Sequence, residues 1–462
     1  MLTNPVQLYA EVFKTGEAIF KDIFRVLGVS RTRPDGANHP IALNTLPWHR
    51  KELVKVSDDE AGVACGIGQL LPVKKFKTNP GKKAVTVEEV RKGIFVLQND
   101  QLKVTVEKGC ITSLYDLVNE REVIEAGQNA NKFLIFDDKP LYWQAWDVEV
   151  YHLDTAKELI ASETRIGEVK EYQVSVVTKV KISEKSSLVS TITLSAALDG
   201  VQSWVECHAE VDWHETMKFL KVEFPVEVRN TEASYETAFG ITRRPTHYNT
   251  TWDMAKFEVC CHRFADLSEP AYGVSILNDS KYGFSTCGNL MRLSLLRAPK
   301  APDAHADMGK HSIKWAIFPH AGALGPATVK AAYAFNSPLR PLAAPKEKIE
   351  SLVGKYPVTL TGDESLILDT VKRGEDDEDV SRGELPRRKG RSVILRVYES
   401  LGSQSRAVIQ TSWKVKKVFK TNILEDDLEE IRTESAGKFK ITLRPFEVAT
   451  YRLQLHDGRG EL

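Results

Sequence analysis

Hydrophobic and polar residues alternate along most of this chain. The stretch Val205–Trp213 has an apolar residue at every second position, and the same pattern recurs in Leu220–Val228, Val393–Val397, Phe439–Leu443 and Ala449–Leu455. A period of two residues predicts antiparallel strands with one face buried and the other in water. Many such strands with almost no helical repeats predict a mainly β protein of stacked antiparallel β-sandwich domains.

The start of the chain departs from this pattern and predicts one N-terminal helix. Its apolar face, at helical spacing, comprises Leu8, Val12, Ile19, Phe20, Ile23, Phe24 and Leu27. Gly28 is a suitable residue at which such a helix ends. One amphipathic helix cannot bury its apolar stripe alone, and the sequence predicts no second long helix after it. The helix therefore needs a partner that the pattern does not identify.

Changes in composition predict four parts: the helix 1–28, a first β-domain 29–100, a large β-sandwich 101–340 and a C-terminal β-sandwich 341–462. The first β-domain contains predicted strands near Ile41–Leu46 and Ile94–Leu97. The proline-rich stretch Ser337–Pro345 predicts a linker. An acidic run at 375–379 and a basic run at 387–391 predict a solvated hairpin loop whose opposite charges attract each other.

Charge and hydropathy exclude some classes of function. Lys and Arg together number 63, as do Asp and Glu, so the chain is not a strongly basic nucleic-acid binder. No apolar run reaches about 18 residues, which predicts no membrane span. The N-terminus lacks a basic segment followed by an apolar core, so we expect no signal peptide. We therefore expect the chain to be synthesised in the cytoplasm.

Six cysteines without a CxxC pair predict reduced thiols rather than a zinc ribbon or a disulfide framework. Cys260 and Cys261 are adjacent and are expected on opposite faces of a strand. His305, Asp307 and His311 lie in a loop, and their spacing matches no common helical pattern of metal ligands. The chain also lacks GxSxG, HExxH, phosphate-loop and dinucleotide motifs.

Two segments are chemically distinctive. Residues 136–147 contain Tyr142, Trp143, Trp146 and three acids, including Asp147. Aromatic faces stack on the C–H faces of sugars and carboxylates accept hydrogen bonds from their hydroxyls, which predicts a carbohydrate surface. The alternative is that both tryptophans are core residues at a strand edge.

The second segment, Arg243–Asp253, is dense in hydrogen-bonding groups and contains Pro245. A loop so rich in donors often contacts a ligand. The alternative is an ordinary polar loop with a local turn.

Together these segments carry a family resemblance. The runs that carry it are Asn44–Trp48, Tyr142–Asp147, Arg244–Asp253, Asp266–Glu269, Tyr272–Val274, Met291–Arg297 and Lys372–Asp376. They resemble α-mannosidases of glycoside hydrolase family 38, of the fungal vacuolar or cytosolic type. The likeness follows nearly the whole chain in order, but it covers only the C-terminal portion of such an enzyme. The helix 1–28 resembles the last helix of that family's middle helical domain.

The resemblance implies a zinc-dependent retaining hydrolysis of terminal α-mannose from glycans. In that family an N-terminal α/β barrel supplies the zinc ligands, the nucleophile and the acid/base carboxylate, and no residue here matches them. This chain would therefore bind no zinc and be inactive alone, while it supplies one wall of the cleft and an assembly surface. Arg244 is the best match for a substrate-binding arginine. Further candidates for that wall are Trp143, Trp146, Asp147 and His247.

Three positions depart from the family pattern: Gln144 and Arg243 replace acids, and His49 stands where Glu is common. Each change removes a negative charge from a region expected to face sugar. The alternative function is a catalytically inactive mannoside-binding or mannosidase-docking module; a third is a degraded product without function. Expected partners are an α-mannoside glycan and either further copies of the chain or an intact mannosidase, in the cytoplasm or the vacuole.

Overall fold

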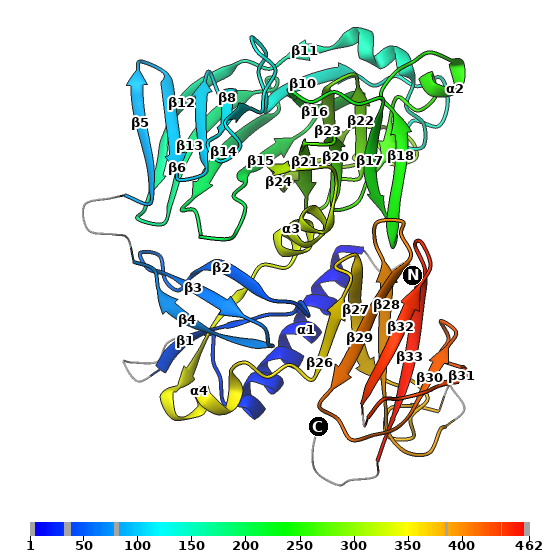
Figure 1. The fold of residues 1–462 in the computed structure, drawn as a ribbon. Helices are drawn as coiled ribbons and strands as arrows, with labels where there is room; N and C mark the ends of the chain where they lie inside the picture. Colours follow the sequence, from blue (N-terminus) through cyan, green and yellow to red (C-terminus); the bar gives the residue numbers. More distant parts are fainter. Residues whose placement is uncertain (1–4, 32–37, 78–82, 384–386, 436, 457–462) are drawn as a thin grey trace. The chain divides into compact units, whose positions relative to one another are not determined.

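The computed structural model describes residues 5–31, 38–77, 83–383, 387–435 and 437–456. Its contacts divide the chain into two compact units (Figure 1). The N-terminal unit comprises Met1–Lys77, Ser337–Leu360 and Ile409–Lys414. The larger unit comprises Thr78–Asn336, Thr361–Val408 and Val415–Leu462. This division groups residues 29–77 with the N-terminal helix, and residues 78–100 with the large β-sandwich.

The N-terminal unit combines two helices with a five-stranded sheet of order β2-β3-β4-β1-β25. Its elements are α1 (Pro5–Leu27), β1 (Asn38–Leu43), β2 (Arg50–Lys55), β3 (Ala61–Gly66), β4 (Leu70–Lys75), β25 (Arg340–Pro345) and α4 (Lys346–Leu352). The prediction of a linker at Ser337–Pro345 is wrong, because β25 pairs with β1 from Arg340 to Pro345. An edge strand tolerates the prolines that suggested a linker, since one side of it needs no N–H donors.

The predicted helix is confirmed as α1, and so is its end at Gly28. Gly28 has φ 68°. The N–H of Val29 donates to the carbonyl of Phe24 at 2.9 Å, and the N–H of Gly28 donates to the carbonyl of Arg25 at 3.2 Å. These two bonds form a Schellman motif, which requires a left-handed residue. Phe24 packs in a cluster with Val29, Ile41, Leu70, Leu342 and Ala344. Phe20 and Leu27 are partly buried against the same cluster. Other apolar residues of the helix remain exposed, namely Leu8, Val12, Phe13, Ile19 and Ile23.

The larger unit contains three sheets upstream of residue 337. The five-stranded sheet has the order β5-β6-β7-β8-β9, with β5 (Val85–Arg91), β6 (Ile94–Asn99), β7 (Leu102–Glu107), β8 (Cys110–Asp116) and β9 (Arg121–Glu122). The six-stranded sheet has the order β11-β10-β16-β23-β22-β19, with β10 (Lys132–Asp137), β11 (Lys157–Glu158), β16 (Lys218–Pro225), β19 (Val259–Cys260), β22 (Gly283–Cys287) and β23 (Leu290–Arg297).

The nine-stranded sheet has the order β12-β13-β14-β15-β24-β21-β20-β17-β18. Its strands are β12 (Ala161–Val169), β13 (Gln173–Lys181), β14 (Ser187–Ser195), β15 (Val205–Trp213), β17 (Glu232–Thr237), β18 (Gly240–Pro245), β20 (Phe264–Ser268), β21 (Tyr272–Asn278) and β24 (Gly309–Ala321). Phe133 of β10 meets Trp315 of β24 edge to face at 6.0 Å, so side chains of the six- and nine-stranded sheets share a core.

A helix that the sequence did not predict, α3 (Pro326–Asn336), packs against β21, where Oγ1 of Thr328 lies 3.3 Å from Oγ of Ser275. Its Val329, Ala332 and Tyr333 are buried. Its apolar positions are mostly small, so they give a weak periodic signal.

Downstream lies a five-stranded sheet of order β27-β28-β33-β30-β31, with β27 (Leu366–Arg373), β28 (Ser392–Glu399), β30 (Val415–Thr421), β31 (Asp427–Ile431) and β33 (Val448–Leu455). A three-stranded sheet has the order β26-β29-β32, with β26 (Val358–Gly362), β29 (Ser405–Thr411) and β32 (Lys438–Leu443). All five period-two stretches from the sequence form strands, which confirms the mainly β class. Cys260 is exposed and Cys261 buried, as predicted.

The charged runs at 375–379 and 387–391 lie between the paired strands β27 and β28, most of their residues are exposed, and opposite charges pair as predicted, Arg388 with Asp376 and Arg391 with Asp379. The prediction missed that part of the acidic run is buried. Arg452 of β33 is fully buried, and Asp376 accepts from its Nη1 at 2.9 Å and from Nε of Arg388 at 3.0 Å. Asp377 is also buried and accepts from Ser392. A buried guanidinium needs paired carboxylates, and the acidic run supplies them. Across the described residues, no helix is long and apolar enough to span a membrane.

Candidate functional site

The predicted aromatic segment is an exposed turn between β10 and the 3-10 helix η1 (Val150–Thr155). Trp143 is 76% and Trp146 88% exposed, and Leu141 and Tyr142 are also exposed. Both tryptophans therefore project from the larger unit rather than fill a strand edge, which overturns the alternative that they are core residues. We call residues 139–147 the aromatic turn.

Backbone bonds close the aromatic turn. The carbonyl of Trp143 accepts from the N–H of Trp146 at 2.6 Å and from that of Asp147 at 2.9 Å. Trp143 has φ 54°, a left-handed conformation that costs a bulky residue energy and is retained where the surrounding structure holds it. The side chain of Asp147 is exposed beside Trp146 in the sequence. The turn thus presents two indole faces and a carboxylate to solvent.

Arg297, at the end of β23, holds the inner side of the turn and was not found from the sequence. Its guanidinium donates to both carboxylate oxygens of Asp138 at 2.7 and 3.1 Å. It also donates to the carbonyls of Gln144 at 2.9 Å and Asp147 at 2.6 Å. Burial raises the pKa of Asp138, and the paired guanidinium of Arg297 opposes that shift.

A buried ionic pair belongs to the same six-stranded sheet. Lys221 of β16 has no exposed surface, and its Nζ lies 2.6 Å from Oε2 of Glu258 and 4.4 Å from the ring centroid of Phe219. Glu258 also accepts a hydrogen bond from Ser294. Burial lowers the pKa of Lys221, while the charge of Glu258 opposes that effect. This pair ties Glu258, five residues after the end of the second predicted segment, to the six-stranded sheet.

His152 of η1 contacts Phe136 of the first predicted segment and Phe257, which lies four residues after the second. Its ring lies 5.2 Å from the ring of Phe136 and 5.9 Å from that of Phe257, measured between centroids. Its Nδ1 lies 2.7 Å from the carbonyl oxygen of Glu149. Burial lowers the pKa of His152 to about 4, so the ring is neutral near pH 7. Phe257 follows α2 (Thr251–Met254), and Figure 1 shows α2 at the end of the larger unit that also carries β10 and β11.

The second segment spans the end of β18 and α2. Arg244 lies on β18, an edge strand, opposite Ala233. Its half-buried side chain makes no hydrogen bond or ion pair within the part of the chain that the structure describes. Such a guanidinium is available to donate to a ligand.

His247 faces Asp253 rather than the aromatic turn. Its Nδ1 lies 3.6 Å from Oδ2 of Asp253, and Thr250 caps α2 by accepting from the N–H of Asp253 at 3.1 Å. The local turn expected as the alternative is therefore present. Among the described residues, neither Arg244 nor His247 makes a hydrogen bond, ion pair or ring contact with the aromatic turn. The structure brings the two segments to one end of the unit without joining these side chains.

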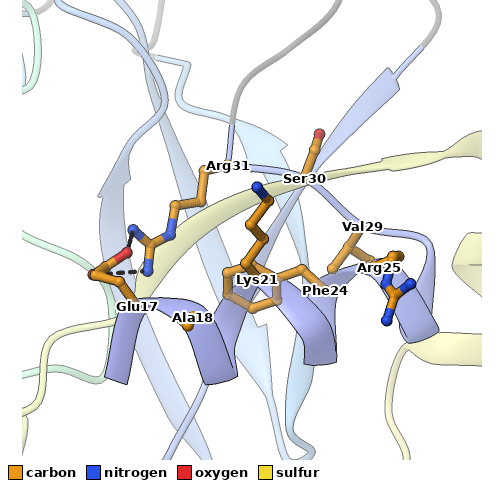
Figure 2. A pocket seen from close by; sticks show the side chains of 8 residues that line it. All are labelled: Glu17, Ala18, Lys21, Phe24, Arg25, Val29, Ser30 and Arg31. Atoms are coloured by element: carbon orange, nitrogen blue, oxygen red, sulfur yellow. Dashed lines mark hydrogen bonds and ion pairs between the residues drawn. The ribbon is translucent and has the colours of Figure 1, made fainter. Parts of the chain in front are cut away.

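The N-terminal unit has a separate hollow of about 490 Å³ on α1, which the sequence did not indicate (Figure 2). It is lined by Glu17, Ala18, Lys21, Phe24, Arg25, Val29, Ser30 and Arg31. Glu17 is paired with Arg31, with N–O distances of 2.5 and 3.2 Å. Lys21 and Arg25 leave the lining with more cationic than anionic groups, a chemistry that suits an acidic partner.

Comparison with known proteins identifies the family. The family described as "Glycosyl hydrolases family 38 C-terminal domain" matches residues 97–305. The family described as "Glycosyl hydrolases family 38 C-terminal beta sandwich domain" matches residues 365–451. The chain belongs to glycosyl hydrolase family 38. The resemblance predicted from the sequence is thereby confirmed.

Relatives within the family support the same assignment. The chain is 49% identical over 387 residues to "Alpha-mannosidase" of Saccharomyces cerevisiae, covering 78% of this chain and 34% of that protein. It is 36% identical over 462 residues to "Alpha-mannosidase 2C1" of Homo sapiens, covering 97% of this chain and 42% of that protein. The chain thus spans well under half the length of these two relatives.

A solved structure shows the same fold. The crystal structure of an alpha-mannosidase from Enterococcus faecalis matches with a TM-score of 0.70 at 13% identity, over 97% of this chain and 60% of that one.

The three departures from the family 38 pattern have distinct surroundings. The side-chain oxygen of Gln144 accepts from the N–H of Lys300 at 2.9 Å, so it is bound within the protein rather than offered to sugar. Nε2 of His49 lies 3.6 Å from the Sγ of Cys65 in the N-terminal unit. Arg243 is exposed on β18.

The metal chemistry expected from family 38 finds no ligand set here. Within the described ranges, no group of three or more His, Cys, Asp or Glu side chains could hold a metal ion. His311, in the loop weighed from the sequence, lies with Nε2 2.7 Å from the carbonyl oxygen of Asp307. The residues described here therefore do not fit a zinc site.

Proposed function

We propose that this chain is the C-terminal portion of a retaining α-mannosidase that removes terminal α-mannose from glycans. Its place in family 38 supports the chemistry, and the aromatic turn is the observation that carries the role of this portion. Two bulky indoles exposed on a braced turn cost solvation energy, and such surfaces mark binding sites. The turn supplies one wall of the substrate cleft.

Each side chain of that wall has a defined task. Trp143 and Trp146 stack on the C–H faces of mannose, and Asp147 accepts hydrogen bonds from its hydroxyls. Arg244 donates charge-assisted hydrogen bonds to hydroxyls or to a carboxylate. His247, paired with Asp253, borders Arg244 in the sequence and offers an imidazole nitrogen. These groups orient the sugar and exclude water, and none of them is assigned the role of nucleophile or acid.

The zinc ion that the resemblance implies would be bound outside the described residues of this chain. The resemblance assigns the zinc ligands, nucleophile and acid/base group to a barrel, so this chain alone is proposed to be inactive. The exposed apolar face of α1, with the cationic hollow beside it, is the proposed assembly surface. A location in the cytoplasm or vacuole remains a prediction.

The length of the natural polypeptide tests the proposal first. An antibody raised against residues 348–462 is used to immunoblot a cell extract. A band about twice the mass of this 51.8 kDa chain supports the C-terminal portion of a longer mannosidase. A band near the mass of the chain itself contradicts it.

Sugar binding is tested on the purified 462-residue chain. Tryptophan fluorescence is followed during titration with α-linked mannobiose, with cellobiose as the control disaccharide. Calorimetry then compares Trp146→Ala with Tyr282→Ala, since Tyr282 is 57% exposed and lies outside both predicted segments. We expect only Trp146→Ala to weaken binding. A flat signal at millimolar mannobiose overturns the proposed wall.

The second candidate is an inactive mannoside-binding or mannosidase-docking module. The observation that favours it is the apolar face of α1, where Val12 and Phe13 are 66% and 73% exposed. A band at the mass of this chain, together with co-purification of an intact mannosidase that Phe13→Glu abolishes, would establish the docking version.

A further inference from the structure

We propose that Arg297 is the positioning residue of the aromatic turn: its guanidinium sets the shape in which Trp143 and Trp146 are presented to mannoside. This inference rests on the proposed function, because it names the residue that prepares that wall for its ligand. Arg297 itself lies beneath the turn and is 19% exposed. It acts through the backbone of the turn and through Asp138.

Arg297 is itself held in place from several directions. It is the last residue of β23, and its carbonyl accepts from the indole N–H of Trp213 at 3.1 Å. Trp213 is completely buried. The bidentate hydrogen bond to the carboxylate of Asp138, a residue that is 2% exposed, fixes the plane of the guanidinium. A planar fork of donors fixed in this way has a defined direction, which a flexible ammonium lacks.

From that fixed position the guanidinium reaches two backbone carbonyls in the C-terminal part of the aromatic turn. Its Nη2 donates to the carbonyls of Gln144 and Asp147, which are three residues apart. The chain reverses from Trp143 to Asp147, with the carbonyl of Trp143 accepting from the N–H groups of Trp146 and Asp147. Since these carbonyls point inward to Arg297, the turn is held with both indoles in solvent. The indoles have little packing of their own to hold them there.

A second contact ties the turn to the chain beyond β23. The N–H of Lys300 donates to the side-chain oxygen of Gln144 at 2.9 Å. Gln144 is thus bound by its backbone to Arg297 and by its side chain to Lys300. An aspartate, which the family pattern favours at this position, has a side chain one methylene shorter. The hydrogen bond between Lys300 and Gln144 is therefore a further restraint on the aromatic turn, and Lys300 lies only three residues after Arg297.

The test compares Arg297→Lys with a matched control, Arg292→Lys. Both arginines lie on β23, both are 19% exposed, and each pairs with a buried carboxylate, Asp138 or Glu223. Only Arg297 contacts the aromatic turn. Lysine retains the charge opposite the carboxylate, so both variants are expected to fold, and a thermal unfolding curve checks that they do. The control reports the general cost of losing a guanidinium from this strand.

Two measurements are made on both variants. The first is hydrogen–deuterium exchange of the turn amides, above all those of Trp146 and Asp147. The second is the affinity for mannobiose. We expect Arg297→Lys to speed exchange in residues 139–149 at least tenfold and to weaken mannobiose binding at least fivefold, with Arg292→Lys unchanged in both.

Equal exchange rates in the two variants would overturn the positioning role. Faster exchange in Arg297→Lys with unchanged mannobiose affinity would also overturn it, since the turn would then bind without its brace. If the wild-type chain binds no mannobiose, the proposed function fails, whereas the exchange rates still decide whether Arg297 holds the turn. The two failures are therefore distinguishable.

Discussion

The guanidinium of Arg263 lies 3.6 Å from the ring centroid of Tyr333. Arg263 directly precedes β20, Tyr333 lies on α3, and the hydroxyl of Tyr333 is 2.9 Å from that of Tyr398 on β28. Glu236, which is 4% exposed, pairs with Arg263 on the other side. One stacked guanidinium therefore joins the nine-stranded sheet, the unpredicted helix and the C-terminal sheet within the larger unit.

Replacing Arg263 should destabilise the larger unit strongly. In Arg263→Met the carboxylate of Glu236 is left buried without its partner, which costs about 3–5 kcal/mol. Tyr398→Phe removes one buried hydroxyl pair and should cost about 1–2 kcal/mol. Urea unfolding gives both values, with Arg165→Met, an exposed position, as the control. A loss for Arg263→Met no larger than that of the control would contradict the joining role.

His152 should make the stability of the larger unit depend on pH between about 6.5 and 4. Burial lowers its folded-state pKa to about 4 from an ordinary value of 6.5. Below pH 6.5 the unfolded chain binds a proton that the folded chain does not, so stability falls as the pH falls and the loss is complete near pH 4. With solvent screening, the loss should be about 1–3 kcal/mol.

The check is urea unfolding of wild type and His152→Asn at several pH values. Asparagine retains a donor for the carbonyl of Glu149 but does not titrate in this range. The variant should lose the part of the pH dependence that lies between pH 6.5 and 4. Parallel pH profiles for the two proteins would contradict the assignment.

Arg452 should be essential to the C-terminal sandwich. Its guanidinium is fully buried, contacts Asp376 and lies 3.2 Å from Asp427. In Arg452→Met the acidic run would lose its central cation, at a cost of about 3–5 kcal/mol. The matched control is Arg444→Met, because Arg444 is 83% exposed and its pair with Glu447 contributes little. Melting curves followed by circular dichroism measure the stability of both variants, and we expect a large loss only for Arg452→Met.

Asp376 gives the same network a pH dependence of the same sign as that of His152, but at more acidic pH. Burial alone raises the pKa of Asp376, but hydrogen bonds from Arg388 and Arg452 outweigh it and hold the pKa below the ordinary 3.8. The stabilisation is therefore present above about pH 4 and is lost as the pH falls through the lower folded-state value. Asp376→Asn should lower stability at pH 7 and flatten the acid limb; an unchanged acid limb would contradict the prediction.

Substitution by alanine should change the stability of the protein in opposite directions at Gly16, within α1, and at Gly28, which caps it. Gly28 has φ 68°, and a Cβ there would lie 2.1 Å from Nζ of Lys348, so Gly28→Ala should cost about 1–2 kcal/mol. Gly16 lies within α1 with no atom within 4 Å of a Cβ, so Gly16→Ala should stabilise by about 1 kcal/mol. Thermal melting of both variants tests this prediction. A Gly28→Ala variant more stable than the wild type would contradict the Schellman cap at Gly28.

The alternation of apolar and polar residues was enough to predict where most strands lie. Val205–Trp213 is a strand in both the prediction and the structure, and the helix ends at Gly28 in both. These features depend on local rules: a strand shows its two faces alternately, and a glycine accepts a left-handed conformation. The family resemblance also came from short runs of sequence, since they are collinear with the family.

The tertiary structure alone decided the features that depend on residues far apart in the chain. Trp143 and Trp146 could equally have been core residues until Arg297, about 150 positions away, was seen to hold the carbonyls of Gln144 and Asp147. The proline-rich stretch became a strand because β1 lies beside it. The acidic run became partly buried because Arg452 required its charges. A local pattern records how residues prefer to lie, but burial and pairing are set by partners that only the folded chain brings within reach.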